Sequence, residues 1–102
     1  MEFNKLVRDR IPELIRENGQ NPLTRILNDW EYSAALEQKL DEEVGEFHRD
    51  RNLEELADIL EVVYALTEDL GYTGDDLLDC CRHKREQRGG FRDRIFLISN
   101  EG

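Results

Sequence analysis

Two pairs of acidic residues in this sequence share one spacing, Glu43-x-x-Glu46 and Glu55-x-x-Asp58. Residues three apart lie on the same face of a helix, so each pair can present its two carboxylates side by side. Like charges held this close repel one another unless a cation offsets them. Hard oxygen ligands in this number suit Mg²⁺, and also Mn²⁺. Two antiparallel helices could thus bring four carboxylates to one point and form a metal site.

The direction of Glu43 sets it apart from ordinary helix surface. On a helical wheel Glu43 falls inside the apolar stripe of its segment, and Glu46 falls at the edge of that stripe. The stripe consists of Tyr32, Leu36, Leu40, Val44 and Phe47. Because a buried carboxylate without a partner is costly, this position favours a cation beside Glu43.

A simpler interpretation treats these acids as helix caps and solvated surface. Glu55 stands three residues after Asn52, which is the spacing of a capping box. The other acids that this interpretation assigns to solvated surface are Glu42, Glu46 and Glu54. The spacing alone supports the two interpretations equally, and Glu43 is the residue that the surface interpretation explains least well.

Capping and helix-breaking residues divide the chain into expected elements. Pro12 and Gly19 can bound a short helix, and Gly71 and the Gly89-Gly90 pair can end two later ones. The expected helices cover about 11–18, 28–49, 53–70 and 73–88. Segments 24–27 and 94–98 are β-prone and are candidates for pairing with each other. The sequence therefore predicts a single all-α domain over residues 1–102 with two short β-prone segments.

The helix expected at 53–70 is apolar on more than one side. One stripe consists of Leu56, Ile59, Leu60, Val63 and Leu66, whereas Val62 and Ala65 lie on another face. A chain of 102 residues with a 38% apolar share builds only a small core. We therefore expect a second copy of the chain to cover the remaining face, in a homodimer or a homotetramer.

Basic residues are concentrated in two short stretches near the ends of the chain, which hold nine of its fourteen lysines and arginines: Lys5, Arg8, Arg10, Arg82, Lys84, Arg85, Arg88, Arg92 and Arg94. Forked arginine side chains satisfy phosphate oxygens in pairs, so these stretches are candidates for binding a phosphate chain. The alternative is that Lys84, Arg85 and Arg88 only complement the negative end of their helix. That alternative does not account for Lys5, Arg8 and Arg10.

The overall composition excludes several classes of partner. A net charge of -10 repels a phosphate backbone, so we expect no nucleic acid polymer as partner. No stretch has the roughly 18 apolar residues that a transmembrane helix needs, and the N-terminus lacks a signal-peptide core, so we expect a cytoplasmic protein without a membrane partner. Cys80 and Cys81 are adjacent and are expected to be reduced thiols.

Three segments resemble one family. The acidic motif is similar to that of the all-α nucleoside triphosphate pyrophosphohydrolases, the MazG-like superfamily. The opening KLVRDRIP at 5–12, EELADILE at 54–61 and KREQRGGF at 84–91 resemble more narrowly the predicted house-cleaning pyrophosphatases related to MazG. The resemblance covers nearly the whole chain and implies a helical bundle completed by oligomerisation.

The resemblance also implies roles for individual residues. It implies Mg²⁺ ligands at Glu43, Glu46, Glu55 and Asp58, with Glu42 as an auxiliary. The catalytic group would then comprise Glu42, Glu43 and Glu46, and Glu42 or Glu46 would orient or deprotonate the attacking water. Lys84, Arg85 and Arg88 are the first candidates for the phosphate tail, and Lys5, Arg8 and Arg10 are the second.

The expected reaction is hydrolysis of a nucleoside triphosphate to monophosphate and pyrophosphate, with non-canonical or excess nucleotides as substrates. One alternative is a phosphoribosyl-ATP pyrophosphohydrolase. Another is a non-catalytic acidic helical module that binds a basic protein. No residue identifies the base, because Trp30, Tyr64 and Phe91 can equally belong to the core.

Overall fold

The structure is a computed structural model that describes residues 4–102. Its helices are α1 (Ile11–Glu17), α2 (Asp29–Asp50), α3 (Leu53–Asp69) and α4 (Gly74–Arg88). No strand occurs among the described residues. The all-α prediction is therefore confirmed for this part of the chain, and the four helices begin and end within about one residue of the expected positions.

Side-chain caps start the three long helices. Asn28 and Glu31 form a complete capping box at α2, and Thr73 and Asp76 form another at α4. At α3 only half of this arrangement exists: the Asn52 side chain accepts from the Glu55 amide at 3.0 Å, and Glu55 gives no side-chain bond in return. The carboxylate of Glu55 is thus left available for another role, as the capping interpretation did not expect.

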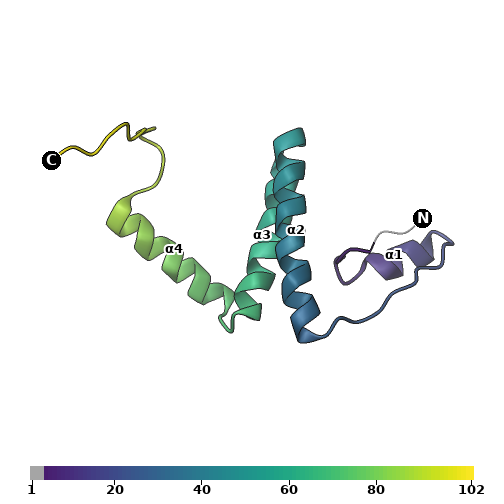
Figure 1. The fold of residues 1–102 in the computed structure, drawn as a ribbon. Helices are drawn as coiled ribbons and strands as arrows, with labels where there is room; N and C mark the ends of the chain where they lie inside the picture. The colour runs from purple at the N-terminus through teal and green to yellow at the C-terminus, as the bar shows by residue number, and fades with distance from the viewer. Residues whose placement is uncertain (1–3) are drawn as a thin grey trace.

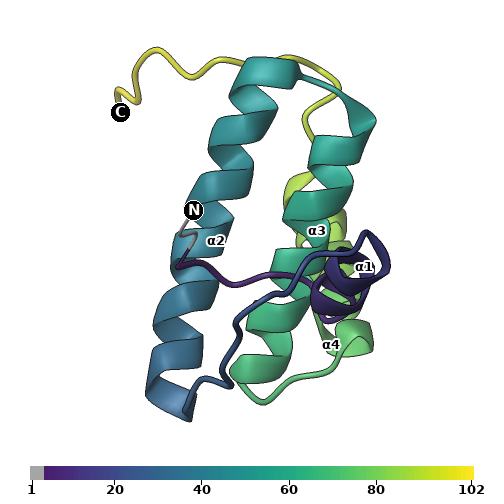
Figure 2. The ribbon, with the colours of Figure 1, turned by 90° about the vertical axis from the view of Figure 1, so that its right-hand side faces the viewer.

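A very short connection joins α2 to α3. Only Arg51 and Asn52 separate the two helices, and Arg51 adopts the left-handed conformation with φ 49° while its N–H donates to Phe47 at 2.8 Å. This reversal places α2 and α3 antiparallel and side by side (Figures 1 and 2). Because the connection is so short, residues at similar distances from it on the two helices face each other.

The α2–α3 hairpin contains the small core of the chain. Leu36 of α2 and Val62 of α3 are the buried apolar residues among those described. Thr67 is also buried, and its hydroxyl donates to the Val63 carbonyl at 2.8 Å. The expected inward stripe of α2 is confirmed at Leu36, whereas its other members are only half-buried.

The rest of the chain extends away from this hairpin. α4 leads off from the end of α3 and α1 lies on the other side of the hairpin (Figure 1), which gives extents of 63 × 32 × 22 Å. The radius of gyration is 18.1 Å, against about 13 Å for a compact chain of this length. The accessible surface is 9589 Å², about 3,600 Å² more than a compact protein of this mass exposes.

The β-prone segments do not pair in the single chain, so that prediction is wrong at this level. Residues 24–27 precede α2, whereas 94–98 follow α4, and the two lie at opposite ends of the molecule (Figure 1). Both lie outside helices and are uncovered, with Ile26 94% and Ile98 90% exposed. The direction of α4 separates them, and the residue pattern could not show that direction.

The described helices also test two other predictions, on membrane-spanning segments and on the state of the cysteines. Within residues 4–102, none of them combines the length and the hydropathy that crossing a bilayer requires. Cys80 and Cys81 lie exposed on α4 as free thiols, as expected.

We predict that the chain is an obligate homo-oligomer, because Leu56 and Leu60 of α3 remain 46% and 48% exposed and Phe91 is 97% exposed. The excess surface of the single chain is more than the roughly 1,000–2,500 Å² that each partner buries in an obligate interface, so it is large enough for such an interface. Light scattering at micromolar concentration should give a dimer or tetramer, and the melting temperature should rise with concentration. A fully folded, stable monomer would contradict this prediction.

Candidate metal centre

Packing of α2 on α3 brings three of the four predicted ligands together. One carboxylate oxygen from each of Glu43, Glu55 and Asp58 lies within 4.8 Å of the other two. Glu43 comes from α2, and the other two come from successive turns of α3. These three carboxylates form what we call the carboxylate cluster. Its separations would let a single cation contact one oxygen of each residue.

Glu43 is the buried member of the carboxylate cluster. The residue is only 6% exposed, as its place in the apolar stripe predicted. One of its oxygens lies 3.3 Å from the Lys39 ammonium, and the other is shielded from solvent without any hydrogen-bond partner. Glu55 likewise keeps one shielded oxygen without a partner. Buried acceptors are rarely left unsatisfied, so these two oxygens fit a bound cation.

Both glutamates hold their protons more tightly than usual. Burial raises the pKa of Glu43 and outweighs the opposing effect of Lys39, while the charges of Glu46 and Asp58 raise it further. Burial also raises the pKa of Glu55, followed by the charges of Glu46, Asp58 and Asp50. Glu43 and Glu55 therefore ionise less readily than ordinary glutamates until positive charge reaches them.

Glu46 and Glu42 lie beside the carboxylate cluster rather than in it. Glu46 raises the pKa of Glu43 through its charge and that of Glu55 through its charge and a side-chain contact, and its own carboxylate lies 3.9 Å from the Arg49 guanidinium. Glu42 contacts the Lys39 ammonium at 3.2 Å and the Lys5 ammonium at 3.4 Å. Burial disfavours the charged form of Glu42, but these two lysines outweigh it and lower its pKa.

Lys39 lies beside the carboxylate cluster and was not predicted from the sequence pattern. Its ammonium lies between Glu42 and Glu43, and its side chain is only 16% exposed. The signal was present, because Lys39 stands three and four residues before these acids on one helix. The Lys39 ammonium thus supplies the positive charge that the buried Glu43 carboxylate needs in the absence of metal.

The N-terminal basic stretch reaches the same region. The Arg8 guanidinium donates to Asp58 at 2.6 Å, and Lys5 contacts Glu42. Arg10 differs, because it pairs with Glu13 of α1 at 3.2 Å. Of the second group of candidate phosphate ligands, Lys5 and Arg8 therefore lie beside acidic residues of the site, whereas Arg10 pairs locally with α1.

The C-terminal basic stretch does not reach the carboxylate cluster within one chain. Lys84, Arg85 and Arg88 are exposed on α4, which points away from the α2–α3 hairpin (Figure 1). Arginines instead gather around a hollow at the end of this helix, lined among others by Arg85, Arg88, Arg92 and Arg94. These side chains could meet the acidic site only if another copy of the chain supplied them.

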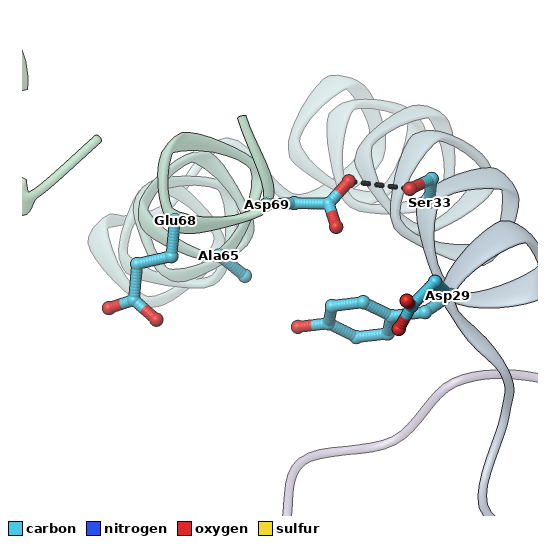
Figure 3. Close-up of a pocket in the computed structure, with 6 residues that line it drawn as sticks. Asp29, Ser33, Ala65, Glu68 and Asp69 are labelled. Carbon is cyan, nitrogen blue, oxygen red and sulfur yellow. Dashed lines mark hydrogen bonds between the residues drawn. The ribbon is translucent and has the colours of Figure 1, made fainter. Parts of the chain in front are cut away.

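A second hollow lies at the far end of the hairpin (Figure 3). It is lined by Asp29, Tyr32, Ser33, Ala65, Glu68 and Asp69. The Ser33 hydroxyl donates to Asp69 at 2.6 Å, and burial together with the charges of Asp69, Asp9 and Glu68 raises the pKa of Tyr32. Such an acidic lining repels phosphate. It also lies about 20 Å along α2 from Glu43, so it is separate from the carboxylate cluster.

The aromatic residues proposed as alternatives for a base pocket do not form a core. Trp30 is 80% exposed and Phe91 is 97% exposed, whereas Tyr64 is half-buried. Trp30 and Tyr64 line neither hollow, and Phe91 lines the hollow at the end of α4, which is remote from the carboxylate cluster.

Comparisons with known proteins add one relative. No family model matches the chain, and no solved structure matches it. Over 54 residues it is 59% identical to an uncharacterised protein of Mycolicibacterium smegmatis, and this match covers 49% of the chain and 55% of that protein. The match thus spans about half the length of the relative, and it adds no activity or ligand to the geometry described above.

The raised pKa of Glu43 predicts a specific pH dependence of stability. The folded state binds this proton more tightly than the unfolded state, so the stability that Glu43 contributes is present at low pH and is lost as pH rises through its folded pKa. Without metal, the melting temperature of the unaltered protein should therefore rise relative to that of Glu43→Gln, and approach it, as pH falls from neutral towards 4.5, the ordinary glutamate value.

Thermal melts in a chelator at several pH values test this expectation. Glu54→Gln is the matched control, because it removes an exposed carboxylate of α3 and should leave the pH dependence in place. Parallel pH profiles for the unaltered protein and Glu43→Gln would show that Glu43 is not held in a proton-favouring environment.

Proposed function

We propose that this chain is a Mg²⁺-dependent nucleoside triphosphate pyrophosphohydrolase related to the MazG-like superfamily, acting on non-canonical or excess nucleotides. The observation that carries the proposal is the buried Glu43 carboxylate, with one oxygen lacking a partner beside Glu55 and Asp58. The KLVRDRIP, EELADILE and KREQRGGF segments add to it, because they resemble one family and lie in the same order.

Carboxylate oxygens are the donor set that Mg²⁺ prefers, and Mn²⁺ shares this preference. Glu43, Glu55 and Asp58 would hold the ion, with Glu46 as a fourth ligand after a change of its rotamer away from Arg49. A bound divalent ion would polarise phosphate oxygens and lower the pKa of a water molecule. Water attack at the α-phosphorus would release the monophosphate and pyrophosphate.

Two glutamates beside the carboxylate cluster are candidates for positioning this attacking water. Glu42 is held by Lys39 and Lys5, so its carboxylate stays ionised and fixed, as a residue that orients water must be. Glu46 has only a 3.9 Å contact with Arg49, so its carboxylate is freer to move and to ligate the ion. Glu42 is therefore the better candidate for orienting the water, and Glu46 for completing the metal ligands.

A second copy of the chain would complete the site in this proposal. The basic end of α4 is remote from the carboxylate cluster in its own chain, while the opposite charges of the two regions favour their approach between copies. A homodimer or homotetramer would thereby bring Lys84, Arg85 and Arg88 to the triphosphate tail. The uncovered apolar residues of α3 would supply the contact area.

The alternative of a non-catalytic acidic docking module fits the geometry less well. A surface that binds a basic protein needs its carboxylates exposed, whereas Glu43 is 6% exposed and Glu55 has a shielded oxygen. A phosphoribosyl-ATP pyrophosphohydrolase would use the same chemistry. Incubation with Mg²⁺ and a panel of standard and damaged nucleotides, including phosphoribosyl-ATP, separates these functions by the monophosphate and pyrophosphate released.

Glu43→Gln tests the metal centre. The variant keeps the shape of the side chain but deletes a ligand and one of several repelling charges. We expect activity to fall by about two orders of magnitude or more, while metal-free stability stays level or rises by up to about 1 kcal/mol. Mg²⁺ should raise the melting temperature of the unaltered protein and not that of the variant.

Glu54→Gln again serves as control, since its exposed carboxylate lies next to Glu55 in sequence but outside the cluster. It should retain activity and the response to Mg²⁺. Full activity in Glu43→Gln, together with no effect of Mg²⁺ on the unaltered protein, would contradict the proposed function and favour the docking module.

Lys84→Gln/Arg85→Gln tests the basic end of α4. Both side chains are exposed and make no described ion pair, so folding should depend on them little. Loss of their charge should raise KM by about tenfold with little change in melting temperature. Arg82→Gln, which removes a local partner of Asp79 on the same helix, should leave KM unchanged. Unchanged kinetics in the double variant with a large loss of stability would assign Lys84 and Arg85 a structural role.

A further inference from the structure

The segment before α1 crosses both helices of the hairpin and is tied to each of them. Figure 2 shows it running from α2 across towards α1, which lies in front of α3. Lys5 contacts Glu42 of α2 at 3.4 Å, and Arg8 contacts Asp58 of α3 at 2.6 Å. Between them Leu6 and Val7 are half-buried. We call residues 5–8 the N-terminal strap.

Arg8 and the proposed metal compete for one carboxylate. Asp58 belongs to the carboxylate cluster, and one of its oxygens already accepts from Arg8. The pair is partly open to solvent, with side chains 54% and 37% exposed. Such exposed pairs contribute little stability, so a divalent cation can replace the guanidinium on Asp58 without disrupting the fold.

Lys39 cannot make the same exchange. It stands on α2 itself, its side chain is 16% exposed, and it contacts two acids of its own helix. Arg8 instead belongs to a non-helical segment and is linked to a residue fifty positions away. Of the cations around the carboxylate cluster, Arg8 is thus the one with both a shared ligand and freedom to move.

The charges around the cluster indicate where a displaced Arg8 would go. The acids that act on the cluster are Glu42, Glu43, Glu46, Asp50, Glu55 and Asp58, and the cations among the described residues that lie within 4 Å of a cluster acid or its neighbours are Lys5, Arg8, Lys39 and Arg49. With every group ionised, these six acids and four cations leave two negative charges uncompensated. A single divalent cation neutralises this charge, so the metal-bound site no longer repels an anion, and a forked guanidinium suits phosphate oxygens.

We infer that Arg8 is an exchangeable counter-ion, which pairs with Asp58 in the metal-free protein and moves to a phosphate oxygen of the triphosphate when a divalent cation occupies Asp58. This inference rests on the proposed function. It gives the N-terminal strap a role in substrate binding that depends on prior metal binding. Metal and triphosphate then bind cooperatively, because the metal releases the residue that the triphosphate needs.

Arg8→Gln tests the exchange by calorimetry in two separate titrations. In the first, Mn²⁺ alone should bind the variant as tightly as the unaltered protein or a few-fold more tightly, since a competing cation is gone. In the second, an α,β-imido nucleoside triphosphate at saturating Mn²⁺ should bind the variant about tenfold more weakly. Without metal, the variant and the unaltered protein should bind this analogue equally weakly.

Two further variants control for charge and folding. Arg16→Gln removes an equal charge from an exposed position on α1 that is not among the candidate phosphate ligands, and it should leave both titrations unchanged. Arg8→Lys keeps the charge without the fork and should recover part of the lost affinity for the analogue. Circular dichroism and thermal melts establish that each variant is folded.

Three results would contradict the exchange, and each has a different meaning. Weaker Mn²⁺ binding by Arg8→Gln would mean that Arg8 orients Asp58 for the metal, and unchanged affinity for the analogue would mean that it does not reach the triphosphate. Either result overturns the exchange and leaves the metal centre standing. If the unaltered protein failed to bind Mn²⁺, the proposed function itself would be overturned together with the exchange.

Discussion

Repulsion among the carboxylates that α2 and α3 bring together is the constraint on which the rest of this structure depends. Glu43, Glu55 and Asp58 converge from two helices in a partly buried place, where water screens their charges poorly. Lys39 and Arg8 offset part of this charge, yet one oxygen of Glu43 and one of Glu55 remain shielded and without a partner. Such an arrangement sacrifices stability in the metal-free protein, which is common at functional sites.

The α2–α3 hairpin is the rigid element that maintains this convergence. Its two-residue connection fixes the register of the two helices, and Leu36 and Val62 pack between them. α1 and α4 add little to the core, and α4 points away from the hairpin (Figure 1). The acidic and basic halves of the proposed chemistry therefore lie far apart in one chain. The same geometry leaves the leucines of α3 uncovered, so charge and hydrophobicity both favour a second copy.

Much of this could be predicted from the sequence, wherever the information is local. Asn28, Asn52 and Thr73 begin the helices where their cap spacing indicates, because a cap depends only on residues three positions apart. The burial of Glu43 follows from helical periodicity in the same way. The pairing of 24–27 with 94–98 was wrong for the opposite reason: β propensity does not specify a partner, and the path of α4 keeps the two segments apart.

The sequence by itself determined the helices, the inward direction of Glu43 and the presence of two acidic pairs, because these follow from the 3.6-residue repeat of a helix. Only the tertiary structure decided which acids meet: Glu43, Glu55 and Asp58 converge, whereas Glu46 lies beside Glu55 and outside this group of three. It also decided that the Glu55 carboxylate is not used in a cap and that Arg8 reaches Asp58 across fifty residues. These outcomes depend on side-chain rotamers and on contacts between distant segments, which no local pattern specifies.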